Sequence, residues 1–256
     1  MSTGFQFKQF FVRHDRSSMK VGTDGVLLGA WAPVPTPLSP LRGEAEGCRI
    51  LDIGTGSGLI ALMLAQRYKD AQINAIDIDE ASCRQARENF DASPWADHLH
   101  VTQCSLQEWR RNESRELRDD SQRYDLIVSN PPFFVNSLKA PDAARCAARH
   151  NDTLPFAELI AHSAELLKIE GTLAVIVPSE AEDELQALAK AAGLQCTARS
   201  YVHPKPGRDP KRVLLAWTKN RIESAEHTEI TERIVLENEH GGRSHDYQQL
   251  TKDFYL

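Results

Sequence analysis

Strand-like apolar runs alternate with helix-length segments along most of this chain. Seven runs have the length and apolar character of strands, and they cover residues 49–54, 73–78, 100–104, 125–129, 172–178, 194–202 and 212–218. Segments between the early runs, such as 57–68 and 80–90, carry apolar or small residues at helical spacing. Strands alternating with helices form a parallel sheet that helices cover on both faces. The sequence therefore predicts a doubly wound α/β fold.

Both ends of this pattern depart from simple alternation. No helix-length segment separates the last two strands, and residues 205–210 are rich in turn-forming residues, so an antiparallel hairpin is expected there. Near the N-terminus, residues 33–40 hold four prolines in eight positions, which predicts an extended connector. We therefore expect an N-terminal segment, residues 1–40, followed by one sheet domain, residues 41–256.

The composition is typical of a globular protein in a reducing compartment. No apolar run reaches about 18 residues, and the N-terminus lacks the continuous apolar core of a signal peptide, so no membrane span is expected. The five cysteines are scattered and form no Cys-x-x-Cys pair, which argues against a disulfide framework or a zinc ribbon. A cytoplasmic protein is the simplest expectation.

A glycine-rich turn directly follows the first predicted strand and opens a helix. Gly54, Gly56 and Gly58 give the spacing G-x-G-x-G in the stretch LDIGTGSGLIALMLAQ. Glycine permits a tight turn and lets a ligand approach the backbone without a Cβ in the way. The dinucleotide motif G-x-G-x-x-G has its third glycine one residue later, where this chain has Leu59. A lone turn of this kind is also typical of simple helix–strand packing.

Two carboxylates make a ligand site the better interpretation. Asp52 ends the strand before the turn, and Asp77 ends the next strand, 19 residues after Gly58. A carboxylate in that place can accept hydrogen bonds from both hydroxyls of a ribose. We expect Asp79 mainly to cap the following helix. An aspartate before a G-x-G-x-G turn resembles the S-adenosylmethionine site of the Rossmann-like methyltransferases.

That resemblance implies roles for the residues around the turn. Asp52 would lie near the amino acid end of the cofactor, and the backbone of the turn, with Gly54, Thr55, Gly56 and Gly58, would face the nucleoside. Methyltransferases of this type often have an acidic residue after the third strand, bonded to the adenine amine. This chain has Cys104 and Ser105 there, so Ser105 is the remaining candidate for that contact.

The fourth predicted strand ends in SNPPFF, residues 129–134. Proline lacks an N–H and fixes φ, so Pro131 and Pro132 end the strand. In a doubly wound sheet this end lies beside the first strand, at the crevice where ligands bind. The side-chain oxygen of Asn130 and the carbonyl of Pro131 can hold the two hydrogens of an amino group and turn its lone pair toward a methyl donor. Phe133 can stack on an unpaired base.

This tetrapeptide resembles the (Asp/Asn/Ser)-Pro-Pro-(Tyr/Phe/Trp) motif of amino-group methyltransferases. That class includes adenine-N6, guanine-N2 and protein-glutamine enzymes, so the motif predicts the chemistry better than the substrate. A ribosomal-RNA guanine-N2 enzyme and a protein-glutamine enzyme are therefore alternatives. Phe134 is a candidate substrate contact, with a place in the core as the equally good alternative.

Longer stretches of the sequence indicate which of these substrates is methylated. The segments FKQFFVRHDRSSMKVGTDGVLLGAWAP, ENFDASPWAD, RVLLAW and YQQLTKDFYL are similar to the tRNA1(Val) (adenine-N6)-methyltransferase family, which modifies position 37 beside the valine anticodon. The resemblance implies a seven-stranded, mostly parallel sheet with one antiparallel strand near the C-terminus. It also implies S-adenosylmethionine as donor, no metal, and a monomer or weak dimer. Residues 20–25, with Lys20, Gly22 and Thr23, would lie over the cofactor.

The charge distribution bears on the RNA. The formal net charge is −6, which argues mildly against nucleic-acid binding. An anticodon stem nevertheless needs phosphate contacts, so basic residues are expected at the catalytic rim. Loops after the fourth, fifth and sixth predicted strands supply the candidates, which are Arg145, Arg149, Lys205, Arg208 and Arg212.

Overall fold

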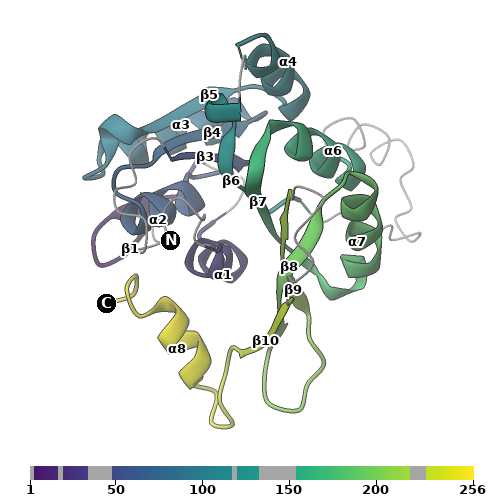
Figure 1. Cartoon of the computed structure of the whole chain (residues 1–256). Coiled ribbons are helices and arrows are strands. Elements are labelled where there is room, and N and C mark those ends of the chain that lie inside the picture. Colours follow the sequence, from purple (N-terminus) through teal and green to yellow (C-terminus); the bar gives the residue numbers. More distant parts are fainter. Residues whose placement is uncertain (1–2, 17–19, 34–47, 117–119, 133–153, 220–228) are drawn as a thin grey trace, which may run out of the picture.

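The computed structural model describes residues 3–16, 20–33, 48–116, 120–132, 154–219 and 229–256. An eight-stranded sheet forms the centre of the molecule (Figure 1), with the strand order β10-β8-β9-β7-β6-β3-β4-β5. Its strands are β3 (Arg49–Ile53), β4 (Gln72–Asp77), β5 (Leu99–Gln103), β6 (Tyr124–Ser129), β7 (Leu167–Pro178), β8 (Gln195–His203), β9 (Arg212–Thr218) and β10 (Ile230–Val235).

The sheet confirms the predicted fold class with one correction to the strand count. All seven predicted strands are present, and β9 runs antiparallel to both β7 and β8. The eighth strand, β10, pairs parallel with β8. Its sequence, ITERIV, is exposed along its first four residues, and only Ile234 is buried. A strand held mainly by backbone pairing at the edge of a sheet lacks the apolar run on which the prediction of seven strands depended.

Helices cover both faces of the sheet. On one face a core cluster joins the sheet to α1 (Thr23–Trp31), α2 (Leu59–Arg67), α3 (Glu80–Asp91) and the segment around α8 (His245–Thr251). A second cluster on the other face includes α4 (Leu106–Glu116), α6 (Phe156–Leu166) and α7 (Glu182–Ala191). None of the helices among the described residues is long and apolar enough to cross a membrane.

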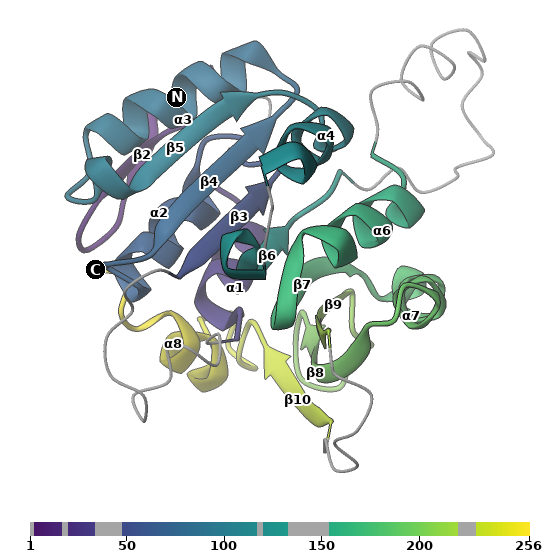
Figure 2. The same cartoon turned by 45° about the horizontal axis from the view of Figure 1, so that its top comes forward.

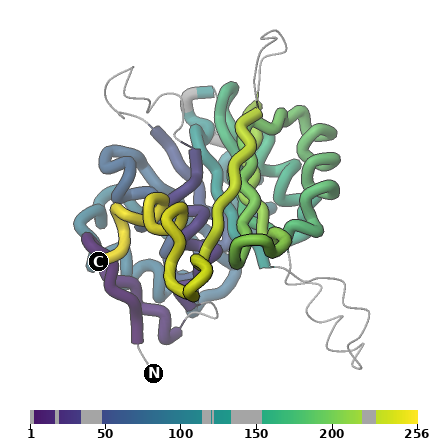
Figure 3. The backbone as a smooth tube through the Cα atoms, turned by 90° about the horizontal axis from the view of Figure 1, so that it is seen from below, coloured from purple at the N-terminus to yellow at the C-terminus, as the bar shows by residue number. Residues whose placement is uncertain are grey.

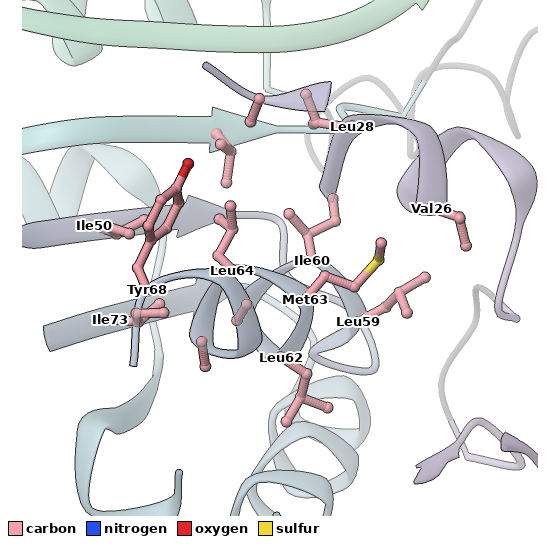
Figure 4. Close-up of a cluster of buried hydrophobic side chains, with 14 of the residues drawn as sticks. Val26, Leu28, Ile50, Leu59, Ile60, Leu62, Met63, Leu64, Tyr68 and Ile73 are labelled. Carbon is pink, nitrogen blue, oxygen red and sulfur yellow. The ribbon is translucent and has the colours of Figure 1, made fainter. Parts of the chain in front are cut away.

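Helix α2 is buried along almost its whole length because it packs against both α1 and the sheet. Every residue from Leu59 to Gln66 is buried. Figure 4 shows Ile60, Met63 and Leu64 within the apolar cluster that joins this helix to its neighbours. A Cβ on Gly29 of α1 would lie 2.8 Å from the Met63 sulfur, so the two helices approach closely where α1 has a glycine. This packing places the start of α1 beside the start of α2.

The two ends of the described chain pack against each other. Strands β1 (Gly4–Gln6) and β2 (Phe11–Arg13) form a small antiparallel hairpin. Between them, the Lys8 amide donates to the Phe254 carbonyl at 2.8 Å, and the Phe7 ring stacks on Tyr255 with centroids 5.8 Å apart. The hairpin and the C-terminal segment accordingly lie side by side in Figure 3.

Candidate active site

The glycine turn between β3 and α2 has a backbone that only glycine adopts without strain at three positions. Gly54, Gly56 and Gly58 have φ values of +72°, +56° and +82°. The Gly54 and Thr55 amides both donate to the Ile76 carbonyl, at 2.9 and 3.1 Å, so the turn is held against β4. A Cβ on Gly54 would meet no atom within 4 Å, which leaves that side of the backbone open to a ligand.

A cavity of about 350 Å³ lies over this turn. Its volume falls at the lower end of the range of small-molecule sites. Three parts of the chain line it: the N-terminal segment with the start of α1, the glycine turn with the start of α2, and the end of β6. The lining residues are Lys20, Gly22, Thr23, Asp24, Gly25, Gly54, Thr55, Gly56, Ser57, Leu59, Ile60 and Asn130.

The structure therefore brings together most, but not all, of the predicted cofactor residues. Lys20, Gly22 and Thr23 face the turn across the cavity, although the prolines of the connector separate them from it in the sequence. Asp52, Gly58, Asp77 and Ser105 do not line this cavity. The side chains of Asp52 and Asp77 form hydrogen bonds with the glycine turn, and that of Ser105 bonds the start of α4. Gly58 has no side chain, which leaves room for the Phe90 ring.

Asp52 lies beneath the turn with no exposed surface. The Thr55 hydroxyl donates to its Oδ2 at 2.7 Å, and within the described part of the chain no group bonds its buried Oδ1 at hydrogen-bond distance. Burial raises the pKa of Asp52 to about 7, although the Thr55 hydrogen bond opposes the rise. Asp52 thus supports the turn through the Thr55 hydroxyl, and its Oδ1 can still accept a hydrogen bond.

Asp77 also supports the turn. Its Oδ2 accepts from the Gly56 amide at 2.8 Å and its Oδ1 accepts from the Asp79 amide at 3.0 Å. Burial raises the pKa of Asp77, and these two amides oppose the rise. Asp79 caps α3, as predicted, because its carboxylate accepts from the Ser82 amide at 2.9 Å. The predicted ribose contact would therefore have to use the remaining lone pairs of Asp77.

Ser105 begins α4 through a capping box. Its amide and hydroxyl donate to Glu108 Oε2 at 3.0 and 2.9 Å, and the Glu108 amide donates back to the Ser105 hydroxyl at 3.2 Å. These bonds lower the pKa of Glu108. The S-x-x-E pattern of this capping box is visible in the sequence. The prediction of an adenine contact for Ser105 did not take this structural role into account. Ile78, to which the sequence analysis gave no role, is 52% exposed directly after Asp77.

Asn130 directly follows β6 and lines the cavity. Its Oδ1 is buried and has no hydrogen-bond partner among the described residues, which is unusual for an amide oxygen. The Ser129 hydroxyl donates to the Ile53 carbonyl at 2.9 Å and so ties this strand end to β3. Pro131 is buried and Pro132 is exposed. The predicted substrate residues Phe133, Phe134, Arg145 and Arg149 lie outside the described residues.

Three predicted RNA-binding cations follow β8. Lys205 pairs with Glu237 at 3.1 Å, and Arg212 pairs with Asp24 at 2.9 Å. Arg208 is exposed. Partly exposed ion pairs of this kind are weak and can exchange partners, so pairing does not prevent a phosphate contact. The Arg212–Asp24 pair additionally connects the first residue of β9 to a residue that lines the cavity.

The fold and site together define the class of the protein. A doubly wound sheet with an open glycine turn after β3, a carboxylate after β4 and Asn-Pro-Pro after β6 is the arrangement of an S-adenosylmethionine-dependent methyltransferase. The unpaired Asn130 oxygen and the unobstructed Gly54 backbone fit a cavity that receives a polar ligand. The family model of the methyltransferase small domain matches residues 38–197. The protein is therefore a methyltransferase that uses S-adenosylmethionine.

Similar curated proteins identify the family. The tRNA1(Val) (adenine(37)-N6)-methyltransferase of Parabacteroides distasonis is 44% identical over 253 residues, which cover 98% of this chain and 97% of that one. The protein of the same name from Cronobacter sakazakii is 41% identical, with 99% and 95% covered. The chain belongs to the tRNA1(Val) (adenine(37)-N6)-methyltransferase family. A solved structure of a predicted O-methyltransferase from Agrobacterium tumefaciens shares the fold, with a TM-score of 0.65, 17% identity, and 90% of this chain and 96% of that one covered.

Proposed function

We propose that this protein methylates the N6 amino group of adenine 37 in tRNA1(Val), beside the anticodon. The observation that supports this most strongly is the buried Asn130 oxygen, unpaired at the edge of the cavity, in a chain whose relatives of 40–44% identity carry that activity in their names.

Asn130 and Pro131 would hold the amino group that receives the methyl group. The exocyclic nitrogen of adenine is a poor nucleophile because its lone pair is delocalised into the ring. When both amine hydrogens bond to the Asn130 Oδ1 and the Pro131 carbonyl, the lone pair turns away from the ring plane. When bound, S-adenosylmethionine supplies the electrophilic methyl group. The rigid proline backbone keeps both acceptors in place, so little reorganisation is needed during the reaction.

Residues on both sides of the cavity would bind the cofactor. From the N-terminal segment, residues 1–40, we assign Lys20, Gly22 and Thr23, and we propose that this segment covers the site of the domain formed by residues 41–256. Gly54, Thr55 and Gly56 would offer their backbone from the opposite side. Asp77 would accept from the ribose, and the exposed Ile78 beside it offers an apolar surface for a purine.

The RNA would approach the same rim. An anticodon loop is unpaired, so its base need not be pulled from a duplex. Phe133 is proposed to stack on the adenine, and Arg208 to contact a phosphate of the stem. Lys205 and Arg212 can contribute after exchanging their carboxylate partners. We further propose that the protein is cytoplasmic, acts without a metal and functions as a monomer.

The substrate can be tested with matched RNAs. The protein would be incubated with labelled donor and either a valine anticodon stem-loop with adenine at position 37 or the same RNA with guanine there. Digestion should give N6-methyladenosine from the first RNA and no labelled nucleoside from the second. Ribosomal RNA and bulk protein serve as the alternative substrates, and Asn130→Ala serves as the inactive control. Label that appears in N2-methylguanosine or in protein, and not in the stem-loop, would contradict the proposal.

A further inference from the structure

Asn89, near the end of α3, is 2% exposed and links two parts of the chain that meet at the cavity. The Arg13 amide donates to its Oδ1 at 2.9 Å, and its Nδ2 donates to the Arg13 carbonyl at 2.9 Å. The same Nδ2 donates its other hydrogen to the Ser57 carbonyl at 2.8 Å. The side chain thus bonds both the backbone N–H and the backbone C=O of Arg13 in β2 and also bonds the glycine turn.

These bonds are difficult to replace. A buried amide whose partners are lost leaves unpaired polar groups, which costs more than the hydrogen bonds themselves contribute. One helical turn earlier, the Gln85 oxygen accepts from the Arg16 amide at 3.1 Å, so α3 holds the N-terminal segment at two points. Figure 2 shows β2 lying beside α3. Asn89 is the member of this pair that also reaches the glycine turn.

Asn89 connects, through its hydrogen bonds, the two segments that form opposite sides of the cavity. Ser57 lines the cavity from the turn, and Lys20 and Gly22, which line it from the opposite side, follow the segment that Asn89 and Gln85 hold. We infer that Asn89 is a positioning residue, which sets the N-terminal segment at the correct distance from the glycine turn and so shapes the cofactor cavity. The inference rests on the proposed function only for the identity of the ligand as the methyl donor.

Asn89→Asp is the sharpest test because it preserves size and the acceptor for the Arg13 amide. It replaces the donating nitrogen with an oxygen that faces two carbonyls. We expect the dissociation constant of S-adenosylhomocysteine, measured by calorimetry without RNA, to rise by about tenfold or more, as expected for the loss of two buried hydrogen bonds. The kcat at saturating donor should change little, because Asn89 does not touch the reacting amine.

Gln186→Ala is the matched control. Gln186 is also an amide on a helix, α7, and its Oε1 accepts from the indole N–H of the buried Trp217 at 2.8 Å, in the core cluster on the other face of the sheet. Its variant should lose thermal stability but change the dissociation constant by less than about threefold. If Asn89→Asp weakens binding no more than Gln186→Ala at an equal loss of Tm, Asn89 is only a structural residue and the inference is wrong.

Arg13→Pro decides the case if Asn89→Asp does not fold. It removes the N–H that donates to Asn89 and leaves α3 and its core unchanged. A dissociation constant raised by more than about threefold in the folded variant supports the inference, and an unchanged value overturns it. Because neither measurement uses RNA, a wrong substrate assignment would leave these results unaffected.

Discussion

Gly54 and Gly58 have the same backbone conformation, but substitution by alanine should have different consequences. Each has a positive φ, so an alanine costs about 1–2 kcal/mol of strain at either position. A Cβ on Gly58 would also lie 2.5 Å from Cε1 of the Phe90 ring, which is 1% exposed and cannot move aside freely. Overpacking adds about 1–3 kcal/mol, so Gly58→Ala should lower the free energy of unfolding by about 2–5 kcal/mol in total.

Gly54→Ala separates binding from stability. Its Cβ meets no atom within 4 Å, so only the strain of about 1–2 kcal/mol is expected, while the methyl group stands beside the cavity where a ligand would approach. Urea unfolding without ligand and calorimetry with S-adenosylhomocysteine measure the two effects. Gly58→Ala should be the less stable variant, and Gly54→Ala the weaker binder at equal folded fraction. Equal unfolding free energies, or wild-type affinity in Gly54→Ala, would refute this account of the turn.

Three further predictions address the remaining parts of the site. Asn130→Ala should lower the single-turnover rate on the stem-loop by roughly 10²–10³ with little change in RNA affinity, and Asn130→Asp should retain more activity, because a carboxylate keeps an acceptor. The pKa of Asp52 is raised to about 7, so between about pH 4 and pH 7 the folded state holds a proton that the unfolded state releases. The free energy of unfolding should therefore fall as pH rises through this range, by up to about 1.4 kcal/mol per unit of pKa difference. Urea unfolding of Asp52→Asn should lack this part of the pH dependence. Arg208→Glu should flatten the salt dependence of tRNA binding, whereas Arg233→Glu on the edge strand β10 should leave the slope unchanged; equal slopes for wild type and Arg208→Glu would place the RNA elsewhere.

Periodicity and glycine spacing predicted the fold and the glycine turn because both depend on local sequence. The apolar period of two identifies a buried strand wherever one face meets a core, and it missed β10 because only Ile234 of that strand is buried. Long-range pairs have no such local signal. The Asp24–Arg212 ion pair joins residues 188 positions apart, and Asn89 meets Arg13 across 76. The structure was needed to show that these contacts surround the cavity.

The sequence also assigned ligand roles to side chains that the fold uses internally. Asp77 has the position expected of a ribose acceptor, but its oxygens accept from the Gly56 and Asp79 amides. The Ser105 hydroxyl likewise donates its hydrogen to Glu108. A sequence motif reports that a polar group stands near a ligand crevice, whereas the hydrogen-bond partners of that group depend on loop conformation, which short-range patterns do not determine.

The contact between the two chain ends has a consequence for synthesis. The β1–β2 hairpin has three residues in each strand, which is too little to be stable alone, and it gains its packing from Phe254 and Tyr255. During translation these partners are made long after the sheet strands β3 to β7. Phe254 and Tyr255 therefore complete the packing of the hairpin that precedes the N-terminal side of the cofactor cavity, so a chain truncated before Phe254 should fold its sheet and bind the methyl donor less well.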